Sequence, residues 1–171
     1  MNGLVGDSTP LRGEKGTCYE GGVRVPTMVY WPGVTQAKHT SALIDVVDWY
    51  PTLLSISQAA APAHTLDGIS LVPLLEGSKM SVRDAVYWHM PCYNGKNINN
   101  PQVWQTPFST VRSGKYKLIH FYEDDHIELY DLEGDIGEAH NLAEALPEIA
   151  KQLSDKLNEW CRKTNAPIPV K

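Results

Sequence analysis

Residues 11–33 read LRGEKGTCYEGGVRVPTMVYWPG, and this stretch decides how the rest of the chain is interpreted. Two glycine-rich turns flank Lys15, and a run of β-branched and aromatic residues follows from Val23 to Trp31. Glycines precede this run and Pro32-Gly33 ends it, which is typical of a largely buried strand. The sequence therefore predicts a strand over residues 23–31, but it does not by itself explain why one lysine lies among so many glycines.

A nucleotide phosphate does not explain Lys15. The phosphate-binding loop of nucleotide enzymes needs the pattern Gly-x-x-x-x-Gly-Lys-Ser/Thr, whereas Glu14 and Gly16 stand on the two sides of this lysine. The acidic neighbour would also repel a phosphate group. From these residues alone, Lys15 is best interpreted as a solvated lysine of a turn.

Composition is that of a globular protein of one domain or two small ones. The chain has 171 residues, of which 42% are hydrophobic and 20% are charged. Its net charge of −5 argues against binding to a nucleic-acid backbone, and no apolar run is long enough to span a membrane. The three cysteines form no Cys-x-x-Cys pair, which argues against a structural zinc site. We therefore expect neither nucleic acid nor a membrane as a partner.

Hydrophobic periodicity predicts two helices. The first follows Asp45 or Asp48, either of which would cap it, and Pro51 falls in its first turn. Its residues expected to face inward are Val47, Tyr50, Leu54 and Ile56. The second begins near Pro147 and has apolar residues at three- and four-residue steps. These are Leu146, Ile149, Ala150, Leu153, Leu157, Trp160 and Cys161.

Three segments have the composition and turn signals of short strands. They are residues 84–90, 108–122 and 127–132, and the second contains a hairpin-type turn at RSGKYK. Strands followed by one amphipathic helix predict an α+β unit. Between residues 58 and 80 the composition shifts to Ala, Pro and Gly, which is typical of a seam between two units.

The order of these motifs resembles that of the sulfatase (arylsulfatase) family of the alkaline-phosphatase-like superfamily. Residues 10–33 are similar to a sulfatase segment in which a Gly-x-Lys-Gly turn leads through Tyr-Glu-Gly-Gly-x-Arg-x-Pro into a strand that ends at Trp-Pro-Gly. Further segments follow in the family's order: DVVDWYPTLLSIS (45–57), LDGISLVPLLEG (66–77), VYWHMPCY (86–93), VRSGKYKLI (111–119) and ELYDLEGDIGEAHNLA (128–143). Several motifs in the correct order are more specific than any one of them.

The resemblance implies a fold of the α/β plus α+β class. Residues 1–78 would form the C-terminal part of the sulfatase α/β domain, which has an alkaline-phosphatase-like fold. Residues 79–171 would form the C-terminal α+β subdomain, a small antiparallel sheet packed with a C-terminal helix. In the family, the strand matching residues 23–31 belongs to a large sheet whose other strands precede it, so we expect that strand to expose an apolar edge in this chain alone.

The resemblance also implies roles for particular residues. The lysine that matches Lys15 points at the sulfate group and steadies its non-bridging oxygens, so Lys15 is the expected catalytic residue. His89 would lie on the rim of the substrate pocket and hydrogen-bond a sugar or the leaving group. The alternative is that His89 is a histidine satisfied within the small domain. Where bacterial members often have a second histidine, this chain has Cys92.

The nucleophile and most of the metal site of the family are not found in this sequence. The reaction of sulfatases needs a formylglycine, made in a Cys/Ser-x-Pro-x-Arg motif, and a divalent cation, usually calcium. No cysteine or serine of this chain begins that motif. Asn2 matches the second residue of the family's Asp-Asn metal pair, which makes it a candidate calcium ligand, but one asparagine alone does not hold calcium.

We therefore expect the chain to be the C-terminal portion of a sulfatase and to be inactive by itself. Calcium would bind only in the complete enzyme, formed with the missing N-terminal half or with a complementing chain. The substrate would be a sulfate ester, and a sulfated carbohydrate is one natural form of it. The chain shows no export signal, and a periplasmic or secreted location is the expectation for the full-length protein.

Two alternatives stay open at this point. The chain would be a non-catalytic fragment or a sulfated-glycan-binding module if residues 89–93 bind sugar without any reaction at Lys15. Within the superfamily, hydrolysis of phosphoesters or phosphonates is a further alternative, because related enzymes share parts of this architecture.

Overall fold

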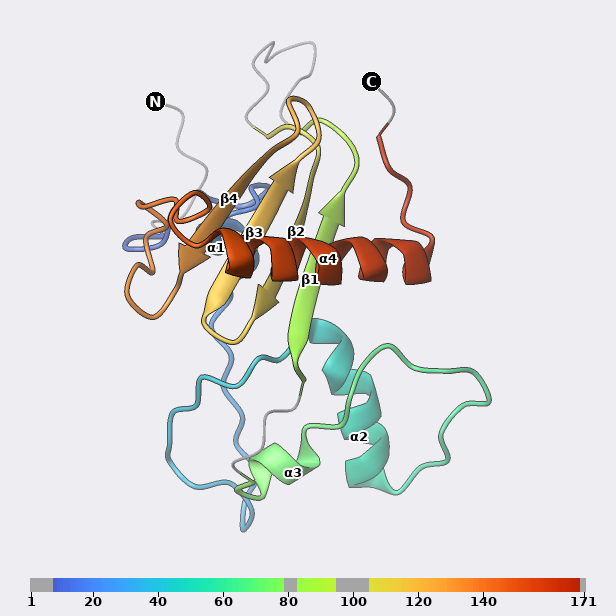
Figure 1. Ribbon diagram of the computed structural model, residues 1–171. Helices are drawn as coiled ribbons and strands as arrows, with labels where there is room; N and C mark the ends of the chain where they lie inside the picture. The colour runs from blue at the N-terminus through green and yellow to red at the C-terminus, as the bar shows by residue number, and fades with distance from the viewer. Residues whose placement is uncertain (1–7, 79–82, 95–104, 170–171) are drawn as a thin grey trace, which may run out of the picture. The chain divides into compact units, whose positions relative to one another are not determined.

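The computed structural model describes residues 8–78, 83–94 and 105–169 (Figure 1). The chain forms two compact units. One combines the N-terminal residues up to Val25 with the residues from Tyr87 onward, and the other runs from Pro26 to Val86. Compact units of this kind are not the same as domains, so the expected division into two domains between residues 78 and 79 stays a prediction.

A four-stranded sheet with the order β1-β2-β3-β4 is the centre of the first unit. The strands are β1 (Ala85–Met90), β2 (Phe108–Ser113), β3 (Tyr116–Phe121) and β4 (His126–Asp131). β3 pairs antiparallel with both β2 and β4, and Gly114, with a φ of +58°, lies in the tight turn between β2 and β3. The strands predicted within residues 84–132 and the predicted hairpin turn are therefore confirmed.

Helix α4 (Pro147–Thr164) packs on one face of the sheet, against β2 and β3 (Figure 1). Its buried residues are Ala150, Leu153, Leu157 and Cys161, which all belong to the predicted apolar face. The ring of Trp160 stacks on Tyr87 of β1 with the centroids 4.9 Å apart. The predicted C-terminal helix is confirmed, and it ends where Asn165 adopts a left-handed conformation with a φ of +53°.

The opposite face of the sheet is covered by residues near the start of the chain. Successive residues of a strand point to opposite faces, and Leu118 and Ile119 of β3 are both completely buried, so both faces are covered. Ile119 and Phe121 belong to an apolar cluster that also contains Cys18. Segments far apart in the sequence therefore share one core in this unit.

The second unit contains η1 (Val46–Asp48), α2 (Trp49–Ser57) and α3 (Val72–Leu75). The expected cap is confirmed, because Asp45 and Asp48 form a reciprocal capping box. Asp48 is fully buried, pairs with Arg83 and accepts a hydrogen bond from the Ile69 N–H. These contacts fasten the segment around residue 69 to the start of α2.

The prediction of which residues around α2 face inward is mostly wrong. Val47, Tyr50 and Ile56 are 42%, 52% and 40% exposed, and the residue of α2 that is buried is Thr52. An amphipathic face is buried only when another element packs on it. No described residue of this unit provides such a layer over these three side chains.

Residues 23–31 do not form the predicted strand. Glu20–Val23 is a single helical turn, α1, and residues 24–31 have no strand partner among the described residues. Val25, Met28 and Tyr30 are 74%, 95% and 85% exposed. A strand requires a neighbouring backbone to pair its N–H and C=O groups, and no described segment supplies it here. In the part of the chain that the structure covers, no helix is long and apolar enough to cross a membrane.

Candidate functional site

Lys15 lies at the tip of a short loop, residues 12–17, which we call the Lys15 loop. Its side chain is exposed, and no carboxylate among the described residues pairs with it. Thr17 closes the loop, since its N–H and its hydroxyl both donate to the Glu14 carbonyl, at 3.0 and 2.8 Å. The ammonium group is thus carried on a closed turn and is left open to a ligand.

Two glycines explain how this loop packs so closely against the turn that follows it. Gly13 has a φ of +74°, and a Cβ there would lie 2.4 Å from Thr17 Oγ1. A Cβ on Gly21 would lie 2.2 Å from the Gly13 carbonyl oxygen. Any larger residue at either position would push the loop out of place, so the glycines around Lys15 serve the shape of the loop.

Arg12 fastens the first end of the Lys15 loop to the sheet unit. Its Nη1 donates to Tyr130 Oη at 2.9 Å and to the Glu138 carbonyl at 2.8 Å, and its guanidinium lies 3.7 Å from the centre of the Tyr19 ring. Burial raises the pKa of Tyr130, and the negative charge of Glu128 raises it further. Tyr130 is therefore a neutral phenol at physiological pH and accepts this bond from Arg12.

Two amide side chains hold the far side of the loop. Asn94 Nδ2 donates to the Gly16 carbonyl at 3.0 Å, and Gln105 Oε1 accepts from the Cys18 N–H at 3.0 Å. Asn94 and Gln105 are joined to each other by backbone hydrogen bonds. The loop is thus fixed from both sides by residues distant from it in the sequence.

Three fully buried charged residues are joined to the loop through the contact of Glu138 with Arg12, and we call Glu20, Lys117 and Glu138 the buried ion cluster. Each is at most 1% exposed. Lys117 Nζ lies 3.1 Å from Glu20 Oε1 and 2.8 Å from Glu138 Oε1. Burial raises the pKa of Glu138, whereas the positive charge of Lys117 lowers it.

Arg112 and Arg24 add positive charge at the edge of the buried ion cluster. Their Nη1 atoms lie 3.4 and 3.8 Å from Glu20 Oε2. Burial lowers the pKa of Arg112, and Glu20 opposes this effect. Glu20 thus pairs with Arg24, but Lys117 is its nearer partner.

His89 lies on β1 with both ring nitrogens engaged. Nδ1 lies 2.6 Å from Ser109 Oγ, and Nε2 lies 3.0 Å from the Pro167 carbonyl. A carbonyl only accepts, so Nε2 carries a proton, and in the neutral imidazole Nδ1 then accepts from Ser109. Ser109 Oγ in turn lies 2.7 Å from Tyr122 Oη. This arrangement fits the alternative of a histidine satisfied within the small domain.

The three residues predicted for the site are not brought together by the described part of the chain. Asn2 lies outside the described residues, and no contact joins His89 to the Lys15 loop within them. No group of three His, Cys, Asp or Glu side chains in residues 8–78, 83–94 and 105–169 is arranged to hold a metal ion.

Sequence reasoning missed the residues that hold Lys15 in place. Lys117 alternates with Ile119 and Phe121 on β3, so the period of the strand places it on a core face. That signal was present in the sequence. Glu138 lies in a glycine-containing turn, and no periodicity marks it as buried.

Comparison with known proteins gives a consistent result. The family described as N-sulphoglucosamine sulphohydrolase, C-terminal, matches residues 13–163. A sulfatase of Formosa agariphila is 36% identical over 177 residues, covering 96% of this chain and 32% of that protein. Human arylsulfatase A is 36% identical over 174 residues, covering 86% of this chain and 32% of its own length. The chain thus spans about a third of the relatives that it matches.

Solved structures show the same fold. A protein in complex with its substrate D-glucosamine-2-N,6-O-disulfate is 30% identical, with a TM-score of 0.57 over 70% of this chain and 24% of that one. The protein i-CgsB, in complex with a neocarrahexaose, has a TM-score of 0.71 over 89% of this chain and 32% of its own. Its identity is 24%, so this second likeness concerns the fold alone.

Proposed function

The chain belongs to the sulfatase family, of which it represents the C-terminal region, and we propose that it completes the active site of an enzyme that hydrolyses sulfate esters. In this proposal Lys15 is the catalytic residue that the chain contributes. Its ammonium group contacts the non-bridging oxygens of the sulfate, where negative charge is present in the substrate and in the transition state.

The observation that supports this proposal most directly is that Lys15 is exposed, and unpaired among the residues that the structure describes, on a loop that is itself held in place. Its side chain is exposed and forms no ion pair within the described residues, while the loop around it is held by Arg12, Asn94 and the buried ion cluster. An unpaired cation on a fixed backbone favours binding of an anion, because the loop loses little conformational freedom when the anion binds.

A sulfated carbohydrate is the substrate class that we favour. The similar solved structures include one bound to a sulfated glucosamine. Calcium and formylglycine, which the resemblance implies for the complete enzyme, stay predictions.

A chimera tests this proposal. In the chimera, this chain replaces the matched region of the Formosa agariphila sulfatase, and hydrolysis of 4-nitrophenyl sulfate is measured. We expect the chimera to be active, and Lys15→Ala to lower kcat/KM by about 10²–10³-fold, as does removal of other groups that stabilise transition-state charge. Lys38→Ala, which removes an exposed lysine of the other unit, is the matched control and should change kcat/KM by less than about twofold.

Two results would contradict the proposal. One is a folded chimera without activity beside a fully active unaltered relative. The other is an active chimera in which Lys15→Ala costs no more than Lys38→Ala. Faster hydrolysis of a phosphonate monoester than of the sulfate ester would favour the phosphonate alternative. Binding of a sulfated glycan that survives Lys15→Ala but not His89→Ala would favour a non-catalytic module.

A further inference from the structure

Glu138 contacts the chain on both sides of Lys15. Its backbone carbonyl accepts a hydrogen bond from Arg12 Nη1 at 2.8 Å. Its Oε2 accepts from the Glu20 N–H at 2.6 Å. Arg12 precedes Lys15 by three residues and Glu20 follows it by five, so one residue from another part of the chain spans the segment that carries the lysine.

Glu138 is itself tied to the central strand of the sheet. Lys117 of β3 lies 2.8 Å from Glu138 Oε1, and β3 is paired along its length with both β2 and β4. The backbone of Glu138 adopts a φ of +51°, which non-glycine residues rarely adopt unless their surroundings hold them there. Both its side chain and its carbonyl are therefore presented in fixed directions.

We infer that Glu138, held by Lys117, is a positioning residue for Lys15. It fixes Arg12, the first residue of the Lys15 loop, and Glu20, three residues beyond the end of that loop, so that the ammonium group is already placed for the sulfate group. This inference rests on the proposed function of Lys15. Because a misplacement of about 1 Å can reduce a rate by about 100-fold, the contact of Glu138 with Arg12 and Glu20 matters for catalysis although Glu138 touches no substrate.

Hydrogen exchange in the 171-residue chain tests the side-chain contact of Glu138 with the Glu20 N–H, because the Glu138 carbonyl that accepts from Arg12 is kept in every variant. The amides to follow are those of Thr17 and Gly21, which donate to Glu14 and Arg12. Glu138→Ala should speed their exchange by at least about tenfold more than it speeds that of the Leu118 amide of β3, which reports any general loss of stability. Glu138→Gln keeps an acceptor for the Glu20 N–H and should retain most of the protection. The control is Glu159→Ala, which removes an exposed glutamate paired with Lys163 on α4.

Kinetics in the chimera test whether Glu138 acts through Lys15. Glu138→Ala should lower kcat/KM by about 100-fold when Lys15 is present, and by less than about twofold in the Lys15→Ala background. Glu138→Gln should restore most of the rate. If Glu138→Ala does not fold, Glu138→Asp replaces it, since the shorter side chain draws the carboxylate away from the Glu20 N–H.

The outcomes separate the inference from the function on which it rests. The inference would be overturned if the losses of kcat/KM caused by Glu138→Ala and Lys15→Ala multiply in the double variant. It would also be overturned if the Thr17 and Gly21 amides of Glu138→Ala exchange as slowly as in the unchanged chain. A loss with Lys15→Ala and none with Glu138→Ala would overturn it while leaving the proposed function intact. No loss with Lys15→Ala would overturn both.

Discussion

Lys117 is a fully buried cation between two buried carboxylates, and its removal tests how far the buried ion cluster stabilises the fold. Lys117→Ala should lower the free energy of unfolding by about 3–5 kcal/mol, because it leaves Glu138 buried without its cation and Glu20 with only the more distant Arg112 and Arg24. Urea denaturation of the chain measures this loss.

The control for this prediction is an exposed ion pair. Lys151→Ala removes a lysine whose Nζ lies 2.6 Å from Asp155 on the surface of α4, and it should cost no more than about 0.5 kcal/mol. Equal losses for the two variants would mean that the buried ion cluster contributes nothing beyond a surface contact.

At the scale of single residues, the sequence predicted Lys15 only through resemblance. Its neighbours alone favoured a solvated turn lysine, and the structure agrees that the side chain is exposed. An exposed lysine can serve as a fixed binding group only if its backbone is held in place. The contacts that hold it here come from Asn94, Gln105 and Glu138. Such distant contacts leave no local pattern in a sequence, so they could not be predicted.

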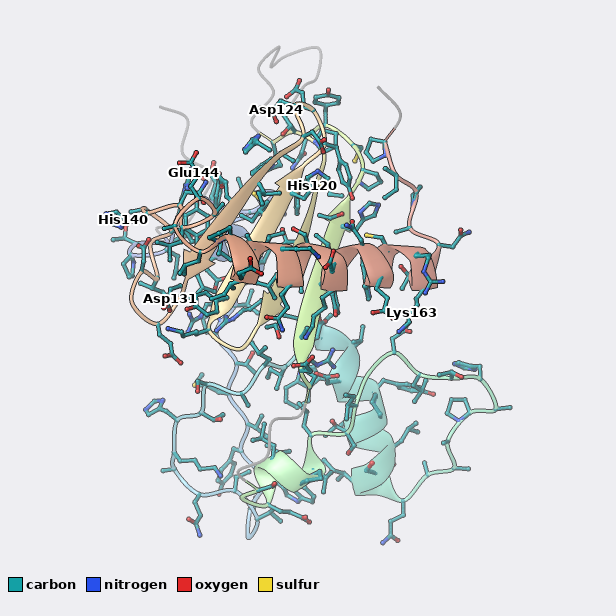
Figure 2. The ribbon with its side chains drawn as sticks, viewed as in Figure 1. His120, Asp124, Asp131, His140, Glu144 and Lys163 are labelled. Carbon is teal, nitrogen blue, oxygen red and sulfur yellow. The ribbon has the colours of Figure 1, made fainter. Side chains whose placement is uncertain are left out.

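At the scale of elements, the turn between β3 and β4 carries a contact that responds to pH. Asp124 Oδ1 lies 2.5 Å from His126 Nδ1 (Figure 2 labels Asp124 at this end of the sheet). The hydrogen bond with His126 lowers the pKa of Asp124. A carboxyl group with a lowered pKa in the folded state stabilises the fold above its unfolded pKa of about 3.9 and loses that contribution as the pH falls through the lower folded value.

His126→Gln tests this assignment. We expect the pKa of Asp124, followed by carboxyl-carbon NMR, to rise toward about 3.9 in the variant. Asp131 is the internal control, because its pKa is lowered by a hydrogen bond from Lys115 at the other end of β4 and should not change. An Asp124 titration that is identical with and without His126 would show that the histidine is not the cause.

The elements that sequence periodicity predicted correctly are those whose partners lie within the chain. Strands β2, β3 and β4 pair with one another, and α4 packs on the sheet that they form. Residues 23–31 have an equally apolar pattern but no strand partner among the described residues, so the pattern alone did not produce a strand. Periodicity indicates which face an element can bury, and pairing decides whether the element forms.

At the scale of the whole molecule, the chain covers about a third of the length of related sulfatases, and it contributes one catalytic candidate rather than a complete site. The family and the class of fold were predictable from the order of several motifs. The roles expected for Lys15, His89 and Asn2 stay predictions, and within the described residues His89 contacts Ser109 and Pro167.

The most direct test of the central claim asks what Lys15 touches during the reaction. In the chimera, kcat/KM is measured with and without Lys15→Ala for a series of aryl sulfates whose phenols differ in pKa. A lysine that contacts the non-bridging sulfate oxygens serves every member of the series alike, so we expect the same loss, about 10²–10³-fold, for each ester. A loss that grows with the pKa of the leaving phenol, or no loss at all, would contradict it.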